Sequence, residues 1–186
     1  MEKQNKDKSN RVRLILSILI ANGIRLLRII PNNDPIMSMA LPYSRRSSAL
    51  TSFVFPLITM VSFDFVTNLL GSWTAVTAIT YGLIGLVFHY YLKDKDKVGM
   101  KRYLGCGIFG VLTFDFITGV LATPIMFGMT FQAAFLGQIP FTLMHLVTTC
   151  AFIIVVTPLL DKQVLVNATF DDSKVWSYLS RLSVSV

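Results

Sequence analysis

Long apolar runs alternate with short polar segments along almost the whole chain. The apolar runs cover about residues 14–30, 47–70, 75–92, 102–126 and 132–160. Each is close to, or longer than, the roughly 20 residues with which a helix crosses the hydrocarbon core of a bilayer. The pattern therefore predicts five long helices that cross a membrane.

A shorter apolar stretch lies between the first two runs. It spans residues 35–44 within PNNDPIMSMALPYSRR. At a rise of ~1.5 Å per residue this stretch reaches about 15 Å, half the thickness of the core. If the backbone before it is extended, the segment can still cross, provided that neighbouring helices shelter its irregular backbone. We expect a short, irregular second helix.

The distribution of positive charge decides the number of crossings. With six crossings, the N-terminal tail, Arg45, Arg46, KDKDKVGMKR and the C-terminal tail share one side, and the loops PNNDP, GSWT and FGMT carry no Lys or Arg. With five crossings, Arg45, Arg46 and KDKDKVGMKR would face outward, against the preference of Lys and Arg for cytoplasmic loops. We therefore expect an all-α polytopic six-helix bundle with both termini in the cytoplasm.

Three regions follow from this topology. We expect a basic cytoplasmic tail (1–13), a transmembrane domain (14–160) and a cytoplasmic tail (161–186). In the last region, Val175, Trp176 and Leu179 recur at helical spacing, which predicts a short amphipathic helix on the membrane surface.

Composition supports a membrane protein. Hydrophobic residues make up 53% of the chain, 15% of residues are charged, and the mean hydropathy is +0.61. The net charge of +7 would also suit a nucleic-acid-binding protein. The basic residues, however, stand in short clusters between apolar runs, where they would meet lipid headgroups. We expect a multi-pass protein of the cell membrane, in contact with lipid and without a nucleic-acid partner.

Besides Arg28, which lies one turn from the outer end of the first helix and should reach the lipid headgroups, three charged residues fall in the outer half of the predicted bundle: Arg25, Asp64 and Asp115. The two aspartates occupy the same place in FDFVT and FDFIT. A charged side chain at a helix centre costs about 2.5–3.5 kcal/mol on insertion scales, so these groups should face inward. They would form a buried ion-pair network or line a cavity that opens outward and binds a polar ligand. A proton relay between the carboxylates is a third interpretation.

Three further residues are candidates for the same cavity. Gln138 and His145 are seven residues apart and share one helix face. A histidine on an apolar helix either hydrogen-bonds to a neighbouring helix or contacts a ligand. Trp73 suits the membrane interface or a lid over an outer pocket.

Ser17 and Ala21 are small residues four positions apart in the first helix. Such spacing marks a close helix contact, either within the bundle or with another membrane subunit.

Several catalytic motifs are absent from the sequence. It contains no GxxxxGK[ST], HExxH or GxSxG motif and no Cys/His spacing typical of metal sites. We expect no enzyme activity, no cofactor and no metal. Active transport would have to draw its energy from partner subunits.

Several features together resemble the substrate-binding S component of energy-coupling factor (ECF) importers. These are six helices in fewer than 200 residues, a first helix ending in IRLLRIIPNNDPI, a short second helix, an aspartate late in the third, and a last helix beginning with GQIPFTLMHL. The resemblance covers about residues 14–160 and extends to uncharacterised small membrane proteins of the same clan. These share an Arg-Leu-Leu-x-x-x-Pro-Asn-x-x-Pro pattern like Arg25 to Pro35.

The resemblance implies a function. An S component captures a vitamin or another micronutrient near the outer face and associates with a transmembrane coupling subunit and ATPase subunits. It implies that Ser17 and Ala21 contact the coupling subunit, in place of the Ala-x-x-x-Ala patch of the family. No ligand contact transfers, so the substrate-binding candidates rest on depth and chemistry alone: Arg25, Asp64, Asp115, Gln138, His145 and Trp73. The rival interpretation is a small membrane enzyme, or an assembly or structural membrane protein with a buried Arg-Asp network.

Overall fold

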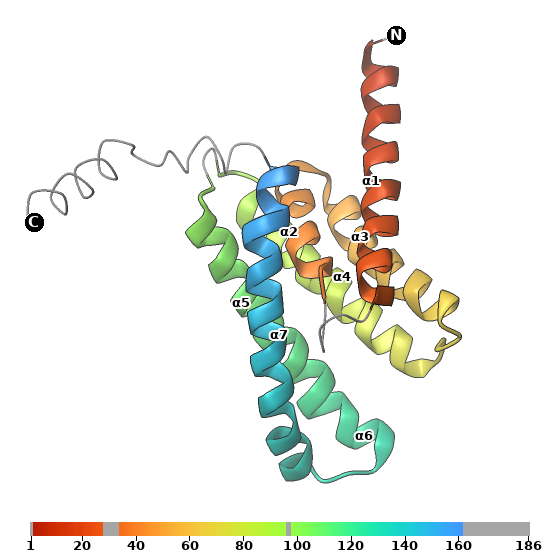
Figure 1. Ribbon diagram of the computed structural model, residues 1–186, viewed down its shortest axis with the longest axis vertical. Coiled ribbons are helices and arrows are strands. Elements are labelled where there is room, and N and C mark those ends of the chain that lie inside the picture. The colour runs from red at the N-terminus through yellow and green to blue at the C-terminus, as the bar shows by residue number, and fades with distance from the viewer. Residues whose placement is uncertain (1, 28–33, 96–97, 162–186) are drawn as a thin grey trace, which may run out of the picture.

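The computed structural model describes residues 2–27, 34–95 and 98–161, with side chains from Val12 onward. Its helices follow in the order α1 (Glu2–Leu27), α2 (Ile36–Arg46), α3 (Ala49–Val66), α4 (Ser72–Leu92), α5 (Met100–Asp115), η1 (Phe116–Ala122), α6 (Thr123–Phe127) and α7 (Phe131–Leu160). Because α5, η1 and α6 are continuous, these elements make six helical segments (Figure 1).

The described residues contain no strand, and four of the helical segments are long and apolar enough to cross a membrane. These segments are Ala49–Val66, Ser72–Leu92, Met100–Phe127 and Phe131–Leu160. The protein is an all-α membrane protein, and the prediction of six helices with a short second one is confirmed.

The first helix is longer than its apolar run. It begins at Glu2, within the basic segment expected to be a tail, and ends at Leu27. Lys, Arg, Gln and Glu are good helix formers, so the helix can continue through polar sequence. The predicted amphipathic helix of the C-terminal tail falls within 162–186, outside the described residues.

Helix α2 lies at the centre of the bundle. It contacts α1, α3, α4, α5 and α7, and eight of its eleven residues are buried. One apolar core packs Leu41 against α4, α5 and α7, and a second packs Ala40 against α1 and α3. The expected shelter of the short helix by its neighbours is therefore confirmed.

Pro42 makes α2 irregular, and neighbouring helices compensate for it. A proline in a helix cannot donate to the carbonyl four residues earlier, which here belongs to Ser38. The hydroxyl of Thr157 in α7 donates to that carbonyl at 3.1 Å. His89 Nδ1 of α4 lies 2.9 Å from the carbonyl oxygen of Ser44 in the last turn of α2. These contacts make an irregular backbone tolerable where no water is present.

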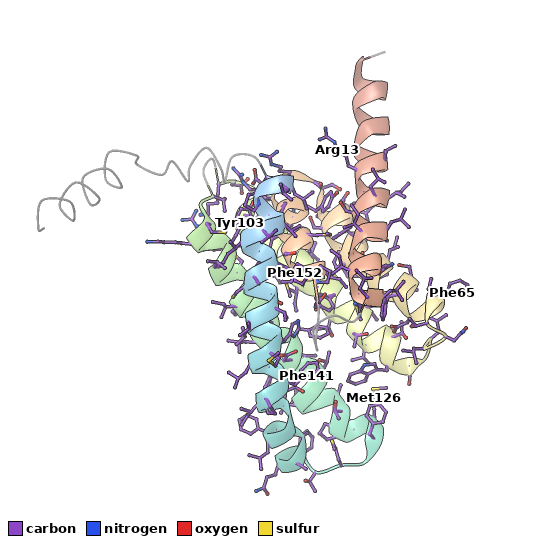
Figure 2. The ribbon with its side chains drawn as sticks, viewed as in Figure 1. Arg13, Phe65, Tyr103, Met126, Phe141 and Phe152 are labelled. Atoms are coloured by element: carbon purple, nitrogen blue, oxygen red, sulfur yellow. The ribbon has the colours of Figure 1, made fainter. Side chains whose placement is uncertain are left out.

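One end of the bundle collects the basic loops, and we call it the basic end. Here the carboxylate of Asp161, directly after α7, accepts hydrogen bonds from Arg45 Nη1 at 2.6 Å, from Arg46 and from Tyr103 Oη at 2.7 Å. Arg45 also donates to the carbonyl of Lys95 at 3.2 Å. Figure 2 shows Tyr103 at this end. The loops at the opposite end, 67–71 and 128–130, contain no Lys or Arg.

Candidate ligand site

Three buried polar side chains meet inside the bundle: Asp34 before α2, Asp115 at the end of α5, and His145 in α7. His145 Nδ1 lies 2.9 Å from Asp115 Oδ1, and His145 Nε2 lies 3.3 Å from Asp34 Oδ2. The exposed fractions are 7% for Asp34, 1% for Asp115 and 2% for His145. We call these residues the Asp–His–Asp cluster.

The length of α2 indicates how far this cluster lies from the basic end. The helix has eleven residues and ends at Arg46, at the basic end. Eleven residues rise about 16 Å, roughly half of the ~30 Å hydrocarbon core. The start of α2, and Asp34 with it, therefore lies about 16 Å along the helix axis from the basic end.

Asp34 is fixed by the start of α2. Its Oδ1 accepts a hydrogen bond from the backbone N–H of Ile36 at 2.9 Å, while its Oδ2 faces His145. A carboxylate at a helix N-terminus also interacts favourably with the helix dipole. The start of the short helix thus holds one of the two carboxylates of the cluster in place.

Asp115 stands where α5 changes to the π-helix η1. Within this segment the hydroxyl of Thr118 donates to the carbonyl of Phe114 at 2.8 Å. Four residues after Asp115, a Cβ at Gly119 would overlap Gln138 Oε1, so Gln138 packs directly on the backbone of η1. Short π-helical segments within helices occur frequently at functional sites.

The geometry of the cluster calls for a second proton, in addition to the one that a neutral imidazole carries. A neutral imidazole carries one N–H, but both ring nitrogens of His145 face carboxylate oxygens. Both contacts are hydrogen bonds together only if His145 is protonated or if Asp34 or Asp115 carries the second proton. The three groups therefore form one unit whose charge depends on its proton count.

One oxygen of the cluster lacks a partner. Asp115 Oδ2 is buried and accepts no hydrogen bond from any residue in the described part of the chain. A buried polar atom without a partner costs about 1–3 kcal/mol, and more if it is charged. An acceptor left open in this way suits a ligand that donates a hydrogen bond or carries a positive charge.

Arg25 forms no ion pair with Asp64 or Asp115, which was one of the interpretations of these three residues. Its Nη1 donates to Met60 Sδ at 3.3 Å, and its guanidinium lies 3.8 Å above the ring of Phe63. Its charge interacts with Asp34 and Asp64, but it forms no ion pair with a carboxylate of the described residues. The aromatic ring and the sulfur take the place of a carboxylate.

The two FDF aspartates differ in their surroundings. Asp64 accepts a hydrogen bond from Thr74 Oγ1 at 2.6 Å, which joins the end of α3 to the start of α4. Its neighbour Phe65 points away from the bundle (Figure 2). Of the two repeat aspartates, Asp115 alone belongs to the Asp–His–Asp cluster.

The remaining predicted residues lie outside this cluster. The rings of Trp73 and Phe127 are 5.5 Å apart and join the start of α4 to α6. Gln138 donates to Thr142 at 3.3 Å. Ser17 and Ala21 are buried against α2, and Ser17 Oγ lies 2.8 Å from Tyr43 Oη, as expected if their spacing serves packing within the bundle.

Sequence reasoning missed Asp34. The segment PNNDP has the composition of an exposed loop, and we assigned it to the outside. A usable signal was present, because a helix too short to span the core must begin inside the bundle if its other end carries Arg45 and Arg46.

The sequence matches a family described as "Family of unknown function (DUF6580)" over residues 5–164. No curated protein and no solved structure matches the chain.

Proposed function

Since the chain belongs to DUF6580, whose function is unknown, we propose from its geometry that it captures a small polar molecule within the membrane. The observation that carries the proposal is the unpartnered Oδ2 of Asp115 inside the Asp–His–Asp cluster. A protein that needed this cluster for folding alone would gain stability by satisfying that oxygen. A ligand that donates to it makes the arrangement complete.

The chemistry of the cluster selects the ligand class. Asp34 and Asp115 offer acceptor oxygens, and His145 between them can hold or release a proton. A ligand with an amine, an amide N–H or a hydroxyl group fits this set. The aromatic rings of Phe114 and Phe141 contact His145 edge-on, with centroids 6.0 and 6.1 Å away, and supply an apolar wall for the rest of the ligand.

We further propose that the protein acts as the substrate-capture subunit of a micronutrient importer in the cell membrane, with its basic end in the cytoplasm. The resemblance to S components over residues 14–160 supports this role, as does the lack of a phosphate-binding loop in the sequence. On this proposal a transmembrane coupling subunit and ATPase subunits supply the energy.

The test of capture is ligand-dependent stability. The purified full-length protein is screened in detergent against a panel of vitamins, amines and other micronutrients, and its unfolding temperature is measured. A ligand at 100 times its Kd adds about 2.7 kcal/mol of stability. Asp115→Asn and His145→Gln should lose this gain. Asp64→Asn is the matched control and should keep it, because Asp64 bonds to Thr74 outside the cluster.

Two results would contradict the proposal at different levels. If no compound stabilises the protein, or if Asp64→Asn loses the gain as fully as Asp115→Asn, capture by the cluster is wrong. If ligand binding holds but purification from the native membrane yields no ATPase subunits, the importer role alone fails.

A further inference from the structure

A groove of about 720 Å³ opens between α4 and α5, near the basic end. Helix α4 packs mainly on α3, whereas α5 packs mainly on α7, and the contact between α4 and α5 themselves is smaller. The volume of the groove lies within the roughly 300–1,000 Å³ typical of small-molecule sites. We call it the α4–α5 groove.

The groove is apolar along its length and positively charged at one end. Val87 of α4 and Phe109 of α5 line it and are more than half exposed. Lys101 and Arg102, in the first turn of α5, line the end nearest the loop. Residues 93–95 and 98–102 contain four basic residues and one acidic residue, Asp94, which gives a net charge of +3.

Gly105 keeps the groove open. Gly107 and Gly110 of the same helix face the bundle, where an added Cβ would collide with Ile153 or Met37. A Cβ at Gly105 would meet no atom within 4 Å. Packing within the bundle therefore accounts for two of these glycines, whereas the third borders the groove.

We propose that the α4–α5 groove binds an anionic phospholipid. One acyl chain lies along Val87, Gly105 and Phe109, and the phosphate group lies at Lys101 and Arg102. An apolar channel that ends in cations at the membrane surface matches a molecule whose apolar chain ends in a phosphate. Tyr91, which also lines the groove, suits the headgroup region, where aromatic side chains gather. This site is separate from the Asp–His–Asp cluster.

Native mass spectrometry of the full-length protein tests this site. The protein is incubated with equal amounts of phosphatidylglycerol and phosphatidylcholine with the same acyl chains. We expect about a 10-fold preference for phosphatidylglycerol. The double variant Lys101→Gln/Arg102→Gln should bring this preference to about parity. Lys93→Gln is its control, since Lys93 lies 5.1 Å above the ring of Tyr90 and does not line the groove.

A second pair of variants tests the apolar part. Gly105→Leu fills the groove and should remove the retained lipid, whereas Gly137→Leu, at a position equally open in α7, should not. Equal retention of both lipids by the unaltered protein would overturn the proposal. So would a Gly105→Leu variant that keeps its lipid but loses a copurifying membrane protein, because the occupant would then be a helix. The double variant changes exposed side chains only, so it tests the site even if Gly105→Leu does not fold.

Discussion

Asp161 and Asp115 are both buried carboxylates next to a cationic or protonatable side chain, but their surroundings differ. Asp161 accepts hydrogen bonds from Arg45, Arg46 and Tyr103, which come from two other helices. Asp115 contacts His145 through one oxygen, and its other oxygen accepts no hydrogen bond from the residues that the structure describes. The comparison separates two uses of a buried charge. A carboxylate whose oxygens both accept hydrogen bonds holds helices together. A carboxylate with one oxygen lacking a donor keeps an acceptor available for a ligand.

The largest expected effect is at Asp161. Asp161→Asn keeps the shape of the side chain but removes the negative charge that pairs with Arg45 and Arg46. Breaking a buried charge pair in this way should lower the free energy of unfolding by about 3 kcal/mol. The loss can be measured by equilibrium unfolding in detergent. Asp94→Asn, an exposed position at the same end, is the control and should change stability by less than about 0.5 kcal/mol.

Lowering the pH should remove the stabilisation that the Asp161 carboxylate contributes. Burial alone raises the pKa of Asp161, but the hydrogen bonds from Tyr103 and Arg45 and the charges of Arg46 and Arg45 outweigh it and lower the pKa below its ordinary value. A carboxyl group whose pKa is lowered by folding stabilises fully above its unfolded pKa, about 3.9. The stability difference between the unaltered protein and Asp161→Asn should therefore stay constant from about pH 8 to 5. It should shrink below about pH 4. A difference that vanishes at neutral pH would contradict this account.

An intermediate effect is expected at Asp64, which is also buried. Thr74→Val removes the hydroxyl that donates to Asp64 and that accepts from the N–H of Gly71 at 3.1 Å. Leaving these groups without partners should cost about 1–2 kcal/mol. Thr80→Val is the matched control, because the hydroxyl of Thr80 donates only to Val76 of its own helix in the described structure. The two variants should differ clearly in unfolding temperature.

The smallest effect on stability is expected at Asp115. Asp115→Asn can keep the contact between Oδ1 and His145 while it removes a buried charge that is incompletely satisfied. Its free energy of unfolding should change by no more than about 1 kcal/mol, in either direction. A loss as large as that of Asp161→Asn would show that Asp115 serves folding, and the contrast between the two carboxylates would fail.

The long helices could be predicted because a bilayer imposes both length and composition on them. The run at 132–160 and α7 at Phe131–Leu160 differ by one residue at the N-terminal end. The short second helix also followed, from the apolar length of its segment and from the charge of Arg45 and Arg46. These features depend on the lipid bilayer, which constrains the length and composition of each segment separately.

The site was harder to predict because it depends on which helices meet. Asp115 and His145 were correctly chosen as inward-facing polar residues, but their pairing needs the contact of α5 with α7. Asp34 was taken for a loop residue because the local sequence PNNDP outweighed the short length of the helix after it. Pairing of Arg25 with an aspartate was one interpretation of the sequence, but Arg25 contacts Phe63 and Met60 instead. Nothing in FITGVLA distinguishes a π-helix from an ordinary helix.

The presence of the π-helix η1 can be tested in related sequences by alignment. A π-helical segment holds one residue more than the ordinary helix it interrupts. Deleting a single residue between Phe116 and Gly119 would restore ordinary helical geometry while the residues that follow keep their direction relative to Asp115, because the wider π turn already absorbs the extra residue. Gln138 would then still pack against the glycine. A one-position gap at this point in an alignment would therefore identify relatives that lack the π-helix but keep the packing around Asp115.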